Sequence, residues 1–266
     1  MSEPVFDAAT GRTFHVGGHE GTLSPEEELL QIDWYMGQHH PQPQDPHEYA
    51  GWVARLPDRL THAAMMVLGA ARDHSWPGTN LGAGLTISTT PVAEVFTPDG
   101  QAATGPRVLA LRPEGLDDTA RAMAWQPPLA ALAVQAGAEV WDLHDPAALS
   151  GALAAAQSPL VVLGAGSAAR TILRAAAAGE LSPATCRIVL SRPDIPDTID
   201  PATALAGFLE EEHPDRLLVL SGTHDVTVTA HPALAGHTTW LPATHHVCTP
   251  ATARERVRLI AEFIRR

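Results

Sequence analysis

Residues 159–178 read Pro-Leu-Val-Val-Leu-Gly-Ala-Gly-Ser-Ala-Ala-Arg-Thr-Ile-Leu-Arg-Ala-Ala-Ala-Ala. An apolar run stops at small residues and an alanine-rich pattern begins, which predicts a buried strand, a tight turn and a helix. If Ser167 is the point of the turn, it forms a nucleophile elbow with its hydroxyl at the helix N-terminus. If Gly164, Gly166 and Ala169 define the turn, they match G-x-G-x-x-A, a dinucleotide-binding turn. A third interpretation is that small residues simply allow a close strand-to-helix crossing.

The composition predicts a globular protein and excludes several mechanisms. The chain has 266 residues, of which 45% are hydrophobic and 18% charged, so it can bury one large core. A net charge of −13 argues against a nucleic-acid partner, because phosphates would meet a repulsive field. All 17 basic residues are arginine. Schiff-base lysines, phosphate-loop lysines and Ser-x-x-Lys acyl transfer are therefore excluded.

Cysteine usage and the N-terminal residues predict a cytoplasmic protein. Cys186 and Cys248 are too few for a disulfide framework. The first residues lack a basic region followed by a long apolar run, and no stretch approaches the length of a membrane span. No metal site is expected, because the 14 histidines include the adjacent pairs His39-His40 and His245-His246 but no His-Glu-x-x-His spacing.

The N-terminal part of the chain predicts helices behind a loose arm. Residues 1–22 are polar and glycine-rich, with no sustained period. Ser24 suits the cap of a first helix, and Asp45 suits the cap of a second one. Residues 24–74 are therefore expected to be mostly helical.

The pattern changes to strands and helices from residue 82 onward. An antiparallel entry is followed by alternating strand and helix patterns, and a closing helix begins at Pro250. This order predicts an α/β fold with a mostly parallel central sheet and helices on both faces. We expect an N-terminal arm and helical cap in residues 1–80 and the α/β core in residues 81–266.

Polar residues follow three of the predicted strands. Ser167 follows the strand in the quoted stretch, Asp225 follows a strand at 217–220, and His245-His246 follows the last strand. Such residues meet at the carboxyl edge of a parallel sheet. The chain order Ser, Asp, His is that of the α/β-hydrolase triad. In such a triad the serine attacks, the histidine takes its proton, and the aspartate orients the imidazole.

From about residue 82 the chain resembles the hormone-sensitive-lipase-like branch of the α/β-hydrolase family. Ala-Gly-Ser-Ala-Ala, ending at Ala169, is similar to its Asp-Ser-Ala-Gly-Gly elbow and places Ser167 on the nucleophile. Leu-Leu-Val-Leu-Ser-Gly-Thr-His-Asp-Val resembles its acid strand and places Asp225 on the triad acid. Thr-His-His-Val-Cys resembles a Gly-Met-x-His-Val-Phe pattern and selects His246 over His245. In that family, N-terminal helices form part of a cap over the acyl pocket.

One segment departs from the family pattern at the oxyanion site. Where the family has His-Gly-Gly-Gly, residues 112–115 read Arg-Pro-Glu-Gly. Proline has no N–H, and Glu114 brings a negative charge to the place where an alkoxide develops. The remaining oxyanion donors are the amide of Ala168 and that of Glu114 or Gly115. Losing one donor costs about 10²–10³ in rate, so the hydrolase is expected to be slow, specialised or inactive.

The resemblance implies a serine carboxylesterase acting on a small acyl or acetyl ester, with no cofactor and with a homodimer as an expectation. One alternative is an inactive relative that binds a ligand or a partner protein. A second is an NADP-dependent oxidoreductase, since residues 162–170 are also similar to the turn of shikimate dehydrogenases. In that interpretation Ser191-Arg192 receives a 2′-phosphate. The catalytic lysine of that family is absent here, which argues against this alternative.

Overall fold

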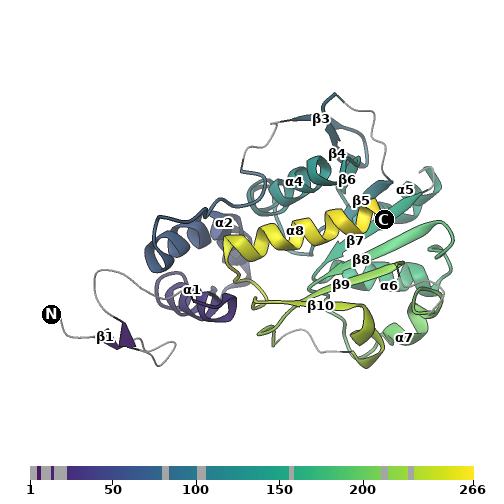
Figure 1. Cartoon of the computed structure of the whole chain (residues 1–266). Helices are drawn as coiled ribbons and strands as arrows, with labels where there is room; N and C mark the ends of the chain where they lie inside the picture. The colour runs from purple at the N-terminus through teal and green to yellow at the C-terminus, as the bar shows by residue number, and fades with distance from the viewer. Residues whose placement is uncertain are drawn as a thin grey trace.

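The core is a mixed sheet built from the predicted apolar runs (Figure 1). The computed structural model describes residues 5–6, 13–14, 23–79, 84–100, 106–155, 159–210, 215–226 and 231–266. The sheet contains β3 (Leu85–Thr89), β4 (Ala93–Pro98), β5 (Arg107–Leu111), β6 (Val140–Leu143), β7 (Leu160–Ala165), β8 (Cys186–Ser191), β9 (Leu217–Gly222) and β10 (Thr238–Leu241). Its strand order is β10-β9-β8-β7-β5-β6-β4-β3. β4 pairs antiparallel with β3 and β6, and all other pairs are parallel.

Helices cover both faces of this sheet. The helices of the described residues are α1 (Pro25–His39), α2 (Pro46–Leu68), α3 (Asp118–Ala120), the π-helical η1 (Arg121–Trp125), α4 (Gln126–Ala136), η2 (Pro146–Ala148), α5 (Leu149–Ala155), α6 (Ala168–Ala177), α7 (Pro201–Ala204), η3 (Ala206–Phe208), η4 (Pro232–His237) and α8 (Pro250–Arg265). Those that cover the sheet are α5, α6 and α7 on one face and α4 and α8 on the other. Because side chains alternate along a strand, Ile188 and Leu190 of β8 pack in the core under α5, α6 and α7. Val189 between them packs in the opposite core, under α4 and α8. The predicted α/β arrangement with two covered faces is confirmed.

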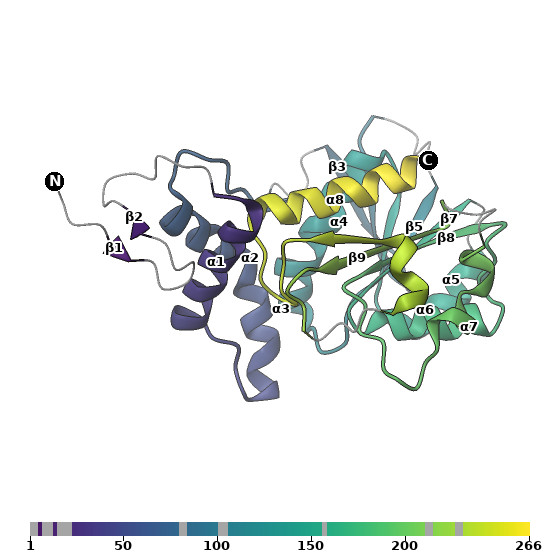
Figure 2. The same ribbon diagram turned by 60° about the horizontal axis from the view of Figure 1, so that its bottom comes forward.

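The two long N-terminal helices gather at one end of the molecule (Figure 2). Ser24 caps α1 in a capping box with Glu27, and the Asp45 carboxylate caps α2 by accepting from the His47 amide at 2.9 Å. The second helix ends at Leu68, a few residues before the predicted limit. Apolar side chains of α1 and α2 form their own core, which also includes Val247 from the loop after β10. A cap of residues 1–80 as a unit separate from the core at 81–266 stays a prediction.

The predicted N-terminal arm lies mostly outside the described residues. Its described parts, β1 (Val5–Phe6) and β2 (Thr13–Phe14), form an antiparallel pair. Among the helices that the structure describes, none combines the length and the apolar character needed to cross a bilayer.

A buried carboxylate connects the sheet to the helices near the predicted site. Asp142 in β6 is fully buried and accepts from Arg121 Nε at 2.7 Å and from Trp125 Nε1 at 2.8 Å. Arg121 also pairs with Glu94 in β4. Removing one partner of a buried ion pair typically costs about 3–5 kcal/mol. This network therefore fixes η1, and with it Trp125, against the sheet.

Candidate active site

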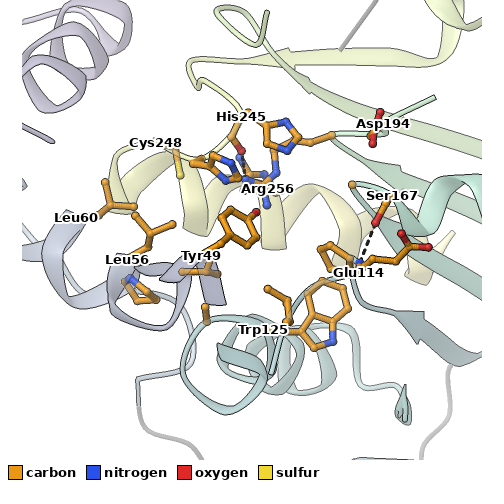
Figure 3. Close-up of a pocket in the computed structure, with 18 of the residues that line it drawn as sticks. Tyr49, Leu56, Leu60, Glu114, Trp125, Ser167, Asp194, His245, Cys248 and Arg256 are labelled. Atoms are coloured by element: carbon orange, nitrogen blue, oxygen red, sulfur yellow. Dashed lines mark hydrogen bonds between the residues drawn. The ribbon is translucent and has the colours of Figure 1, made fainter. Parts of the chain in front are cut away.

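The carboxyl ends of β7 and β8 and the loop after β10 open on a cavity of about 380 Å³. Gly166 and Ser167 follow β7, Arg192 follows β8, and His245 and His246 follow β10. Helix α2 forms the facing wall, with the lining residues Tyr49, Val53, Leu56, Pro57 and Leu60 (Figure 3). The predicted serine and both candidate histidines thus line one cavity.

Asp225 pairs with His245. Its Oδ2 lies 3.0 Å from His245 Nδ1, and its side chain is fully buried while that of His245 is 25% exposed. The loop after β9, which carries Asp225, contacts the loop after β10, which carries His245. The His224 amide donates to the Ala243 carbonyl at 3.0 Å. A Cβ at Gly222 would lie 2.4 Å from that carbonyl oxygen. Glycine at this position therefore permits the approach that brings aspartate and histidine together.

His246 has a different environment from the one expected. Its ring packs edge-on against Tyr49 and Trp52, with centroid separations of 5.7 and 5.2 Å. Burial, and then the neighbouring His245 and Arg192, lower the pKa of His246 to about 3. Asp225 accepts its hydrogen bond from His245, whereas His246 packs against the aromatic side chains of α2. The selection of His246 over His245 therefore stays a prediction, and this arrangement favours His245.

The point of the turn after β7 is Gly166. This glycine has a φ of +53°, in the left-handed region. Ser167, the residue before α6, has helical backbone angles, φ −63° and ψ −21°, and its side chain makes no capping hydrogen bond. A Cβ at Gly164 would lie 2.5 Å from Ile172 Cδ1, so the close contact between strand and helix falls two residues before Gly166. A nucleophile elbow places the reactive residue at the strained point of the turn. In this chain that point carries no side chain, and Ser167 follows it.

The Ser167 hydroxyl contacts the segment that replaces the oxyanion motif. Its Oγ accepts from the Glu114 amide at 2.8 Å (Figure 3). Within the described part of the chain, its hydrogen bond goes to this amide rather than to either histidine. Pro113 covers the point of the turn, since a Cβ at Gly166 would lie 3.4 Å from the Pro113 Cβ.

The three expected oxyanion donors lie in different settings. The Glu114 amide points at Ser167 Oγ and is the donor nearest to the hydroxyl. Gly115 has a φ of +82°, and a Cβ there would lie 4.0 Å from Tyr49, so its amide belongs to a turn beside α2. Ala168 is the first residue of α6 and is 2% exposed. Of the three, Glu114 is the one whose amide is aimed at the serine.

Two arginines of the cavity were not predicted as site residues of an esterase. Arg192 has a φ of +50° and, within the described residues, is the only non-glycine residue in the left-handed region. Its Nη1 donates to the His245 carbonyl oxygen. Arg256 lines the same cavity from α8. The sequence spacing could have indicated that Arg256 points inward. It lies four residues after Thr252 and four before Ile260, and both of these are on the buried face of α8.

Comparison with known proteins places the fold. No family model matches the sequence, and no curated protein does either. An esterase from the bacterial hormone-sensitive lipase family is 16% identical with a TM-score of 0.57, covering 92% of this chain and 99% of that one. A hyperthermophilic esterase from the archaeon Pyrobaculum calidifontis is 16% identical with a TM-score of 0.53, covering 91% and 98%. An arylesterase is 12% identical with a TM-score of 0.53, covering 91% and 98%.

The chain therefore has the α/β-hydrolase fold in the form found in hormone-sensitive-lipase-like esterases, as predicted. The sheet also separates this fold from the dinucleotide-binding alternative. A dinucleotide-binding sheet has the order 3-2-1-4-5-6, whereas this sheet has antiparallel β3 and β4 at one edge and the order given above.

Proposed function

We propose that this chain is a serine carboxylesterase that hydrolyses a small acyl ester in the cavity. Ser167 is the nucleophile, His245 is the general base, and Asp225 orients the imidazole. The observation that carries the proposal is the 3.0 Å contact between Asp225 and His245 beside the cavity that Ser167 also lines. His245 takes the role that the sequence resemblance assigned to His246.

The chemistry follows from the two hydrogen bonds of the site. With Nδ1–H donating to Asp225, His245 Nε2 carries the lone pair that accepts the serine proton. The Ser167 hydroxyl first rotates away from the Glu114 amide and attacks the ester carbonyl. That amide is then free to donate to the oxyanion. His245 passes the proton to the leaving alcohol, and a water activated by the same histidine releases the acid.

We expect the rate of ester hydrolysis to be low. Pro113 supplies no amide, so the oxyanion site has one donor fewer than the family motif, which costs about 10²–10³ in rate. The proposed reaction needs no cofactor, and its partner is a small-molecule ester. The cytoplasmic location and the homodimer expected from the sequence stay predictions.

A second candidate function is ligand binding without turnover. The observation that favours it is the glycine at the point of the turn, where an elbow nucleophile would stand. In that case the Ser167 hydroxyl has a structural role, since it anchors the segment at Glu114. The cavity itself is common to both candidates.

Hydrolysis of p-nitrophenyl acetate and p-nitrophenyl butyrate separates the two candidates. We expect slow turnover by the wild type and a loss of at least about 10²-fold in Ser167→Ala, because a triad member is removed. Ser150→Ala is the matched control, since it removes an exposed hydroxyl that bonds to Glu180 on the surface. Equal background rates in the wild type and in Ser167→Ala would refute the esterase and favour the binding protein.

A further inference from the structure

Three N–H groups of residues that line the cavity are buried and have no hydrogen-bond partner among the described residues. They are Trp76 Nε1, Arg192 Nε and Arg256 Nε. All three residues also line a smaller, more apolar cavity of about 100 Å³ that adjoins the first. Buried donors are nearly always satisfied in folded proteins. Three such donors around one cavity therefore call for an acceptor that the described residues do not supply.

Holding Arg192 and Arg256 near each other is energetically unfavourable. Arg192 follows β8 with a backbone conformation that non-glycine residues rarely adopt. Arg256 reaches the cavity from α8, on the side opposite Trp125 (Figure 3). Burial, and then the nearby charge of Arg256, lower the pKa of Arg192 to about 10. Both arginines are half-buried, and the Nε atom of each is buried. Two like charges in such a place repel each other, so an anion between them would stabilise both.

The carboxylates around the cavity have other partners. Asp194 forms an ion pair with Arg170, and Asp225 bonds to His245. Glu114 is exposed, and among the described residues no carboxylate forms an ion pair with either Arg192 or Arg256. This positive wall lies inside a chain whose net charge is −13. The two arginines therefore carry a charge opposite in sign to that of the molecule, and Asp225 is the carboxylate whose charge acts on Arg192.

We propose that the wall formed by Trp76, Arg192 and Arg256 binds the carboxylate of an organic acid. The planar guanidinium forks suit the two oxygens of a carboxylate, and the indole N–H adds a third donor. The apolar part of the ligand lies against the leucines of the cavity, Leu56, Leu60 and Leu116. This proposal is about ligand binding only. It does not depend on whether Ser167 hydrolyses the ligand.

The test compares a carboxylate with a neutral molecule of the same shape. Binding of 4-phenylbutyrate and of 4-phenylbutyramide to the full chain is measured by titration calorimetry at constant ionic strength. We expect the carboxylate to bind at least about tenfold more tightly. In Arg256→Gln this preference disappears, because one fork is lost. Arg258→Gln is the matched control: it removes the same charge from the same helix, but at a side chain that pairs with Glu255 and Glu262 on the surface.

Arg256→Lys is the second variant if Arg256→Gln does not fold. Lysine keeps the charge but replaces the planar fork by a point charge, so we expect a weakened but measurable preference for the carboxylate. Three results would each overturn the proposal: equal affinity of acid and amide for the wild type, an unaltered preference in a folded Arg256→Gln or Arg256→Lys protein, or no saturable binding of the acid. None of these readouts depends on ester hydrolysis, so failure here is distinguishable from failure of the esterase proposal.

Discussion

The two sides of the cavity differ in how closely they match a working triad. On the histidine side, Asp225 is buried and bonded to His245, and Gly222 lets the two loops touch. On the serine side, the point of the turn is Gly166, and the Ser167 hydroxyl is bonded to the Glu114 amide. The Asp225–His245 pair is thus arranged as a triad requires, while the proposed nucleophile, Ser167, lies one residue beyond the point of the turn.

This difference teaches that a shared fold does not carry a whole active site with it. The histidine side is set by strand ends and by a loop contact that tolerates little change, since any Cβ at Gly222 would collide with backbone. The serine side depends on a single turn, where one residue decides which side chain faces the base. The predictions below test each side in turn, beginning with the largest expected effect.

The histidine side is tested by replacing each of the adjacent histidines. We expect His245→Ala to lower kcat/KM for p-nitrophenyl butyrate by about 10²–10⁴-fold, the usual contribution of a general base. His246→Ala removes packing against Tyr49 and Trp52, and we expect a loss below about tenfold, roughly 1.4 kcal/mol in the barrier. The reverse order of the two effects would contradict the assignment of His245.

The serine side is tested by giving the point of the turn a side chain. Gly166→Ser places a hydroxyl at the elbow position, and we expect the esterase rate to rise by on the order of tenfold, about 1.4 kcal/mol in the barrier. The left-handed backbone at this residue costs a non-glycine side chain about 1–2 kcal/mol, so thermal stability should fall.

Gly166→Ala is the matched control for that gain. It carries the same backbone cost and the same close contact with Pro113, but no hydroxyl. A rate increase in the alanine variant, or none in a folded serine variant, would show that the point of the turn is not where the nucleophile belongs.

The smallest expected effect is the pH dependence of stability that His246 contributes. Its pKa is about 3 in the folded chain against an ordinary value of 6.5. Between these values the unfolded chain binds a proton that the folded chain does not, so the free energy of unfolding falls as pH falls from 6.5 toward 3. One such proton gives a slope of at most about 1.4 kcal/mol per pH unit.

His246→Gln should flatten that slope in denaturant titrations between pH 4 and pH 6.5. His47→Gln serves as control, because His47 is an exposed residue in the first turn of α2. An unaltered slope in His246→Gln would indicate that the folded chain does not keep His246 neutral, and would weaken the distinction between the two histidines.

Much of the fold followed from local sequence patterns. Uninterrupted apolar runs identify β7, β8 and β9 to within about two residues, because buried parallel strands need apolar side chains on both faces. Ser24 and Asp45 were predicted as caps because each offers a side-chain acceptor ahead of a helical pattern, and both accept a backbone N–H there.

The details of the site depend on backbone geometry that the amino-acid sequence alone does not specify. His245 and His246 are neighbours, and their rings are 4.5 Å apart and nearly perpendicular. Which one meets Asp225 depends on a turn in which the Val247 amide donates to Thr244 Oγ. In the same way, the sequence Gly166-Ser167 fits a turn centred on either residue, and only the backbone φ of Gly166 shows that the turn is centred there. Arg192 and Arg256 meet only through the packing of α8 on the sheet.

The most direct test of the central claim is labelling of the folded wild-type protein with a fluorophosphonate, followed by intact mass measurement and peptide mapping. The account predicts a single adduct on Ser167 that is lost in Ser167→Ala and strongly reduced in His245→Ala. A folded wild-type protein that binds small ligands in the cavity but forms no adduct on Ser167 would contradict the serine esterase.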